Sequence, residues 1–299
     1  MPQPGEPSLS VVIPVHNEQE NVGPLYDELR QVLDALARPY EIVFVNDGSE
    51  DDTLFRLRKL RDTDARVRIL DLDGNFGEAA ALSAGFHTAH GEIIVTIDGD
   101  RQNDPEDIPR LLEVLETRGV AVVSGRREDR QEANWSRVIP SRVANTLIAR
   151  VTGVPAHDCG CGLKAYRRAA VPKVHLPRGM NRFLPAIFGV EPGEVAEVPT
   201  RDRRRQHGAS HYGIGRTIVV LRDLLALPFL IHDPRRAEVR AALSTAAAAG
   251  LGALLSDFSR AATVGLDVGA VLCGLVWWNL RRFNRTQREG AYRIRQDYV

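Results

Sequence analysis

The chain has 299 residues, 43% of them hydrophobic, which is enough for one large globular domain with an appendage or for two modest domains. Its 39 basic and 39 acidic side chains cancel, so no net charge attracts the protein to nucleic acid and we expect no nucleic-acid partner. Three cysteines are too few for a disulfide framework and indicate a reducing compartment.

The first part of the chain alternates short apolar runs with amphipathic segments. The first ten residues lack the basic and apolar regions of a signal peptide, so we expect a cytoplasmic start. Five strands are predicted from short apolar runs rich in β-branched residues, over residues 9–14, 40–47, 67–72, 92–98 and 119–127. Four helices are predicted between them, over residues 17–36, 53–62, 76–89 and 105–118. This alternation predicts an α/β fold, with a mostly parallel sheet covered by helices on both faces.

The second part of the chain is predicted to be mainly helical. Its expected elements are a helix, a loop with a strand or turn, a glycine-spaced polar loop and a second helix, over residues 134–153, 156–171, 203–216 and 217–231. We therefore expect an α/β domain over residues 1–216 and a C-terminal region of amphipathic and apolar helices over residues 217–299.

Two apolar segments close the chain, at residues 241–255 and 261–280. A membrane-spanning helix needs about 20 mainly apolar residues, so the second segment is borderline and the first is short. Basic residues before the first segment and after the second suit a hairpin with both ends in the cytoplasm. The alternative is a soluble pair of packed helices, whose apolar surfaces would favour self-association. We expect a protein at the cytoplasmic face of a membrane, either peripheral or anchored by this hairpin.

Polar residues follow each predicted strand, where ligands bind in parallel α/β sheets. These sets are Pro14–Glu18, Asn46–Ser49, Asp71–Gly77, Asp98–Gln102 and Ser124–Arg127. Four of the five contain acids, an unusual lining for a phosphate site unless a cation lies between.

The fourth set contains two carboxylates one residue apart, Asp98 and Asp100. The two carboxylates repel each other, but a divalent cation bound between them attracts both and outweighs that repulsion. Hard oxygen ligands of this kind select Mg²⁺ or Mn²⁺. Gln102 offers a further oxygen. The alternative is a strand end followed by a helix cap. Three further acids are predicted to cap the next helix: Asp104, Glu106 and Asp107.

The motifs at the strand ends together resemble family 2 glycosyltransferases of the GT-A fold. They are Pro14-Val15-His16-Asn17-Glu18, Val45-Asn46-Asp47-Gly48-Ser49, Asn75-Phe76-Gly77 and Asp98-Gly99-Asp100-Arg101-Gln102. Later motifs resemble polyprenyl-phosphate glycosyltransferases, the group that contains dolichol-phosphate mannose synthase. They are Ser124-Gly125-Arg126, the segment from Asp158 to Lys164, the segment from Arg205 to Gly213 and the "AYRIRQ" stretch near the C-terminus.

The resemblance implies a metal-dependent, inverting hexosyltransferase. It would move one sugar, of mannose or glucose type, from a nucleotide diphosphate sugar to a polyprenyl phosphate. A lipid phosphate is already largely ionised at neutral pH, so such an acceptor needs no strict general base. Two alternatives stay open: transfer to a hydroxyl acceptor, and a nucleotide-sugar-binding protein without catalysis.

The resemblance also implies roles for individual residues. The nucleotide and donor would be bound by Pro14, His16, Glu18, Asp47 and Asp98. The metal, Mg²⁺ or Mn²⁺, would be bound by Asp98, Asp100 and Gln102. The acceptor phosphate would be bound by Arg126, Arg205, Ser210 and Tyr212, the last three in a mobile lid. Catalytic roles would fall to Asp100, Arg126 and Asp158, although Asp158 could instead order the Cys159-Gly160-Cys161-Gly162 turn.

Overall fold

The computed structural model describes residues 7–128, 146, 148–150, 152–154, 157–203, 223–230, 233–255 and 260–298. The chain forms two compact units, one of residues 1–211 with 290–299 and one of residues 212–289. The expected helical region, residues 217–299, therefore includes a C-terminal segment that folds with the first unit.

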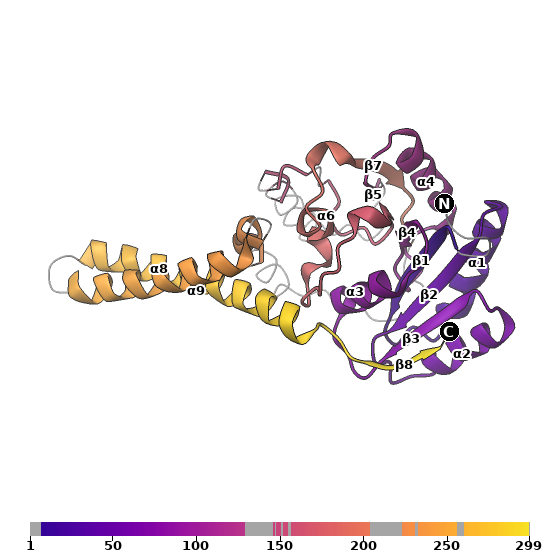
Figure 1. The fold of residues 1–299 in the computed structure, drawn as a ribbon, viewed down its shortest axis with the longest axis horizontal. Coiled ribbons are helices and arrows are strands. Elements are labelled where there is room, and N and C mark those ends of the chain that lie inside the picture. Colours follow the sequence, from indigo (N-terminus) through magenta and orange to yellow (C-terminus); the bar gives the residue numbers. More distant parts are fainter. Residues whose placement is uncertain are drawn as a thin grey trace. The chain divides into compact units, whose positions relative to one another are not determined.

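An eight-stranded sheet forms the centre of the first unit (Figure 1). The strands are β1 Leu9–Val15, β2 Tyr40–Asn46, β3 Val67–Leu72, β4 Ile93–Thr96, β5 Val122–Arg127, β6 Lys164–Arg167, β7 Val195–Thr200 and β8 Ile294–Tyr298. They lie in the order β7-β5-β6-β4-β1-β2-β3-β8. β6 and β8 run opposite to the other six strands. The mostly parallel α/β sheet is thus confirmed, with two strands, β7 and β8, that the sequence analysis did not predict.

Helices cover both faces of this sheet. The longer helices are α1 Val22–Ala35, α2 Thr53–Thr63, α3 Glu78–Thr88 and α4 Ile108–Thr117; the short ones are η1 Pro105–Asp107, η2 Arg168–Ala170, η3 Met180–Phe183, α6 Leu184–Ile187 and η4 Pro192–Glu194. Because side chains alternate along a strand, Val11 and Ile13 of β1 pack toward α1, α2 and α4, whereas Val12 packs toward α3. The two apolar layers fix the sheet and so place the strand ends that form the site.

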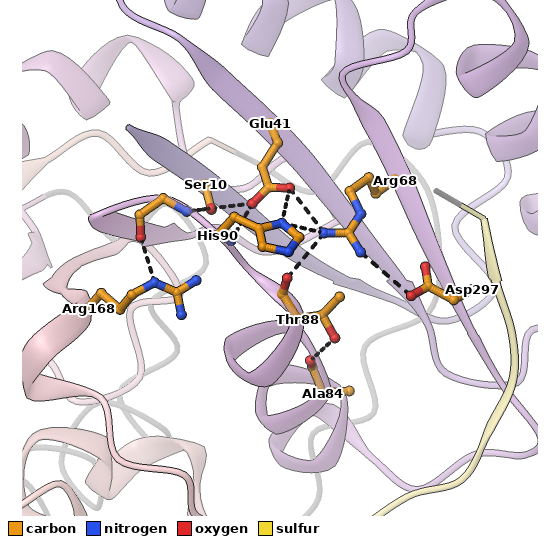
Figure 2. Close-up of polar contacts among 9 residues, drawn as sticks. Ser10, Glu41, Arg68, Ala84, Thr88, His90, Arg168 and Asp297 are labelled. Atoms are coloured by element: carbon orange, nitrogen blue, oxygen red, sulfur yellow. Dashed lines mark hydrogen bonds and ion pairs between the residues drawn. The ribbon is translucent and has the colours of Figure 1, made fainter. Parts of the chain in front are cut away.

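A buried polar network lies at the amino ends of β1, β2 and β3, opposite the carboxyl ends of these strands (Figure 2). The carboxylate of Glu41 accepts hydrogen bonds from the Ser10 hydroxyl at 2.6 Å, the His90 backbone N–H at 2.6 Å and Arg68 Nη1 at 3.2 Å. Arg68 also lies 3.6 Å from Asp297 of β8. The network therefore joins the first three parallel strands to the final strand, far from the carboxyl ends.

The second unit contains two long helices, α8 Pro234–Leu255 and α9 Arg260–Glu289, and residues 223–230 are also helical. The two apolar segments are thus helices, as predicted. Within the described residues one stretch, Thr263–Glu289, is long and apolar enough to cross a membrane by length and composition, and an 18-residue window within it has a mean hydropathy of 1.4. Many large apolar side chains of this unit are exposed: Val239, Leu243, Leu251, Leu254, Val264, Val268, Val271, Leu272 and Trp278.

Candidate active site

The loop after β4 carries the two closely spaced carboxylates. Asp100 is buried, and its Oδ1 accepts a hydrogen bond from the Gln102 backbone N–H at 3.0 Å. Arg101, between Asp100 and Gln102, has a φ of 61°, in the left-handed region that a non-glycine residue adopts only at a cost in free energy. Arg101 also forms an ion pair with Glu28 of α1. The loop is therefore held in a strained shape, as is common at functional sites.

Asp98 fits against a glycine. A Cβ atom at Gly162 would lie 2.2 Å from the Asp98 Cγ, so any larger residue would displace this carboxylate. The Thr96 hydroxyl donates to the Gly162 carbonyl at 2.8 Å and holds the two segments together. The sequence alone indicates no role for Gly162, although this residue lies in the Cys159-Gly160-Cys161-Gly162 run.

Negative charge gathers around Asp98. Burial raises its pKa well above the usual range, and the charges of Glu78 and Asp100 raise it further, against the opposing effects of Lys164 and Arg127. A cation bound between the two carboxylates would offset their repulsion, and their hard oxygen atoms are suitable ligands for Mg²⁺ or Mn²⁺.

The protein by itself offers an incomplete set of metal ligands. No group of three His, Cys, Asp or Glu side chains that could hold a metal ion occurs among the residues that the structure describes. The residues present fit a metal that shares its coordination with a bound diphosphate. Gln102 lies in the same loop as Asp100, and its backbone carbonyl accepts a hydrogen bond from the Arg203 backbone N–H at 2.8 Å. The role of the Gln102 side chain as a metal ligand stays a prediction.

The loops after β1, β2 and β3 are tied together through Asp47. Its carboxylate accepts from the backbone N–H groups of Phe76 at 2.7 Å and Gly77 at 2.8 Å. Burial raises the Asp47 pKa, although these two hydrogen bonds act in the opposite direction. The Asp47 carbonyl lies 2.8 Å from His16 Nδ1, which must donate because a carbonyl only accepts. His16 Nε2 then accepts from Asn75 Nδ2 at 2.9 Å.

The turn after β1 differs from its prediction. The helix expected from Asn17 begins at Val22, and Asn17 itself has a φ of 56°, outside the right-handed helical region. Glu18 lies in this turn, where its carboxylate accepts from Asn21 Nδ2 at 2.5 Å. Pro14 ends near the Asp98 loop, since a Cβ atom on Gly99 would lie 3.1 Å from the Pro14 carbonyl oxygen. The predicted donor-binding residues thus lie at the carboxyl ends of β1, β2 and β4: Pro14 near the end of β1 itself, and His16, Glu18, Asp47 and Asp98 on the loops that follow these strands.

Asp158 is buried and paired with Arg127. Arg127 donates from Nε to Oδ2 at 2.7 Å and from Nη2 to Oδ1 at 3.0 Å. A carboxylate held by a bidentate guanidinium is a weak base, so this geometry favours the alternative in which Asp158 orders its turn. Arg127 was not predicted as a site residue. Its neighbour Arg126 contacts Glu128 at 3.4 Å and has 41% of its side chain exposed, which leaves it accessible to an anionic ligand.

The arginine-rich segment after β7 is described only at its start. Arg203 pairs with Glu28 at 2.8 Å and with Asp104 at 2.7 Å, so the segment is attached beside the Asp98–Gln102 loop. The Asp104 side chain accepts from the Glu106 backbone N–H at 3.0 Å, which confirms its predicted capping role. The remaining predicted acceptor residues, Arg205, Ser210 and Tyr212, lie outside the described residues.

The chain matches one family model and is similar in sequence to enzymes that act on polyprenyl phosphates. The family model described as glycosyl transferase family 2 matches residues 10–174. A dodecaprenyl-phosphate galacturonate synthase of Rhizobium johnstonii is 42% identical over 231 residues, which cover 76% of this chain and 68% of that protein. An undecaprenyl-phosphate 4-deoxy-4-formamido-L-arabinose transferase of Edwardsiella ictaluri is 37% identical over 230 residues, 77% of this chain and 70% of that protein.

A solved structure shares the fold. It is the glucosyl-3-phosphoglycerate synthase from Mycobacterium tuberculosis in complex with Mn²⁺ and UDP-glucose. The match has a TM-score of 0.59 and 20% sequence identity, and covers 74% of this chain and 79% of that one. At this identity the likeness establishes the GT-A fold alone.

Proposed function

Because this chain belongs to glycosyltransferase family 2, we propose that it transfers one sugar from a nucleotide diphosphate sugar to a polyprenyl phosphate. The observation that carries the proposal is the pair of carboxylates, Asp98 and Asp100, at the carboxyl end of β4 in a chain whose relatives are named for this reaction.

The donor would bind across the loops after β1, β2 and β4. Ribose and base would lie near Pro14, His16, Glu18 and Asp47. The diphosphate would lie at Asp98, Asp100 and Gln102 with Mg²⁺ or Mn²⁺, which when bound would stabilise the charge of the leaving nucleotide diphosphate. The structural neighbour crystallised with Mn²⁺ and UDP-glucose supports the choice of a divalent cation.

The acceptor would react directly through a phosphate oxygen. This oxygen attacks the anomeric carbon as the bond to the nucleotide diphosphate breaks, which inverts the anomeric configuration. An ionised phosphate needs no proton removed. The pairing of Asp158 with Arg127 agrees with a reaction without a strong base. The acceptor phosphate would be bound by Arg126 and by three residues of the segment after β7, Arg205, Ser210 and Tyr212.

The membrane would hold the acceptor, and the α8–α9 pair would bring the protein to its cytoplasmic face, either at the surface or as an anchoring hairpin. The exposed apolar side chains of this pair support the proposal. Homo-oligomerisation through the same helices is the expected alternative to burial in lipid.

The donor sugar was predicted to be of mannose or glucose type, and that class stays a prediction. The two relatives are named for galacturonate and for 4-deoxy-4-formamido-L-arabinose. The proposal therefore extends to modified sugars.

Replacement of Asp100 tests the site. Asp100→Ala should abolish transfer and leave the thermal melting curve intact, because the substitution removes a ligand of the diphosphate-bound cation. Asp62→Ala, on the exposed surface of α2, is the matched control and should transfer at the wild-type rate. A hydroxyl acceptor would instead appear as a glycan product without a lipid product. A binding module would bind donor without transfer or hydrolysis, and wild-type turnover by Asp100→Ala would contradict the metal assignment.

A further inference from the structure

A pocket lies beside the Arg127–Asp158 pair, within the first unit. Its apolar lining includes Val154, Phe183, Pro185 and Ala186. Its charged lining comes from β6, β7, η3 and the turn before β6: Asp158, Lys164, Arg182 and Glu197.

The two carboxylates of this lining have partners of their own. Arg127 binds Asp158 in the bidentate geometry given above. Glu197 accepts from the His157 backbone N–H at 2.9 Å and lies 2.5 Å from His157 Nδ1. Neither carboxylate therefore depends on a cation across the pocket.

The two cations are placed differently. Lys164 is buried and donates to the Cys161 carbonyl. Arg182 is half-buried and has no hydrogen-bond or ion-pair partner within the described part of the chain. A guanidinium beside an apolar wall is poorly solvated, so binding of an anion there is favourable.

The four charged residues share this pocket with a cysteine. Cys159 lines the same pocket, and burial raises its thiol pKa to about 11. Lys164, Asp158, Glu197 and Arg182, which line the same pocket, each act electrostatically on this thiol. Lys164 also acts on the carboxylate of Asp98. Cys159 and Lys164 of the pocket lining flank Gly162, against which Asp98 packs. The pocket therefore adjoins the position proposed for the donor diphosphate.

We propose that Arg182 recognises a carboxylate on the donor sugar, so that the pocket selects a nucleotide diphosphate uronic acid over the corresponding neutral hexose. The planar guanidinium matches a carboxylate in a bidentate geometry, and the apolar wall strengthens the interaction by excluding water. This inference rests on the proposed function, because it assumes that a nucleotide sugar occupies the site.

Donor binding tests the inference independently of the acceptor. UDP-galacturonate and UDP-galactose differ only by a carboxylate in place of a hydroxymethyl group, and GDP-mannuronate with GDP-mannose is a second such pair. Titration calorimetry with Mn²⁺ should show that the wild type prefers the uronate of one pair. Arg182→Gln should weaken binding of that uronate about tenfold or more and leave its neutral partner within about twofold. Arg182→Lys should retain part of the preference, and Arg38→Gln, at a surface ion pair with Glu116, should match the wild type.

Three results would overturn the inference: no uronate preference in the wild type, equal weakening of both members of a pair by Arg182→Gln, or an effect of Arg182→Gln on the acceptor KM alone. Thermal melting of each variant establishes that it is folded. If uronate binding follows the expected pattern but no lipid product forms, the acceptor assignment fails and the role of Arg182 stands.

Discussion

At the scale of single residues, Gly162 determines where the Asp98 carboxylate lies. Gly162→Ala should lower kcat/KM by about 100-fold or more, because the new Cβ, 2.2 Å from the Asp98 Cγ, must displace a group whose position matters to within about 1 Å. The measurement is steady-state sugar transfer, with circular dichroism to establish folding. Gly193→Ala is the control, since its Cβ would meet no atom within 4 Å. Wild-type kinetics for Gly162→Ala would contradict the assigned role of Asp98.

Glu41 is the second residue with a sharp prediction. Although burial raises its pKa, the hydrogen bonds from Ser10, His90 and Arg68 outweigh burial, and the pKa is lowered overall. Glu41→Gln should therefore cost about 3 kcal/mol of unfolding free energy at pH 7, because Arg68 loses its buried partner.

The pH dependence of this cost has a definite sign. A lowered carboxylate pKa stabilises the fold above the unfolded-state value of about 4.3, and that stability is lost as the pH falls through the lower folded-state value. Urea unfolding should show that the gap between wild type and Glu41→Gln is largest near neutrality and shrinks in acid. The exposed Glu92, replaced by Gln, provides the control. A gap that stays constant down to acidic pH would contradict an ionised Glu41.

The sequence identified some site residues and missed others for a physical reason. Asp98 and Asp100 were predictable because charges at a strand end have a local signature. The pairing of Arg127 with Asp158, 31 residues apart, depends on β6 inserting beside β5, which spacing along the chain does not reveal. The same holds for Arg182, whose approach to the pocket is a tertiary contact.

At the scale of elements, the packing of α3 on the sheet depends on Gly85. A Cβ there would lie 2.2 Å from the Val12 Cγ1 of β1, so Gly85→Ala should destabilise the fold by about 2 kcal/mol through overpacking. Gly23→Ala in α1, with no atom within 4 Å, should stabilise it by up to about 1 kcal/mol. Chemical denaturation measures both changes; equal effects of the two substitutions would contradict the close approach of α3 to β1.

The sequence predicted the first five strands and the four helices between them, because their apolar periodicity is local and strong. β7, "VAEVPT", and β8, "IRQDY", were missed because one contains a proline and the other is largely polar. Each lies at an edge of the sheet, where one side needs no strand partner. β8 is positioned instead by tertiary contacts such as Arg68–Asp297.

At the scale of the whole molecule, the exposed apolar side chains of α8 and α9 predict binding to lipid. The purified chain should sediment with zwitterionic phospholipid vesicles. Val268→Glu should weaken this binding by at least tenfold, since a charge costs about 3 kcal/mol in the hydrocarbon region. Phe55→Glu, at an exposed apolar residue of α2, should bind like the wild type. A wild-type chain that stays in the supernatant and forms a defined oligomer would favour the packed-helix alternative.

The central claim is transfer of one sugar to a lipid phosphate. The most direct measurement is mass spectrometry of the lipid fraction after the protein is incubated with Mg²⁺ or Mn²⁺, a short polyprenyl phosphate and UDP- and GDP-linked sugars, uronic acids included. We predict that the lipid mass rises by one sugar residue with one donor, and that Asp100→Ala yields no such product. An unchanged lipid accompanied by donor hydrolysis, or by sugar on a hydroxyl acceptor, would contradict the claim.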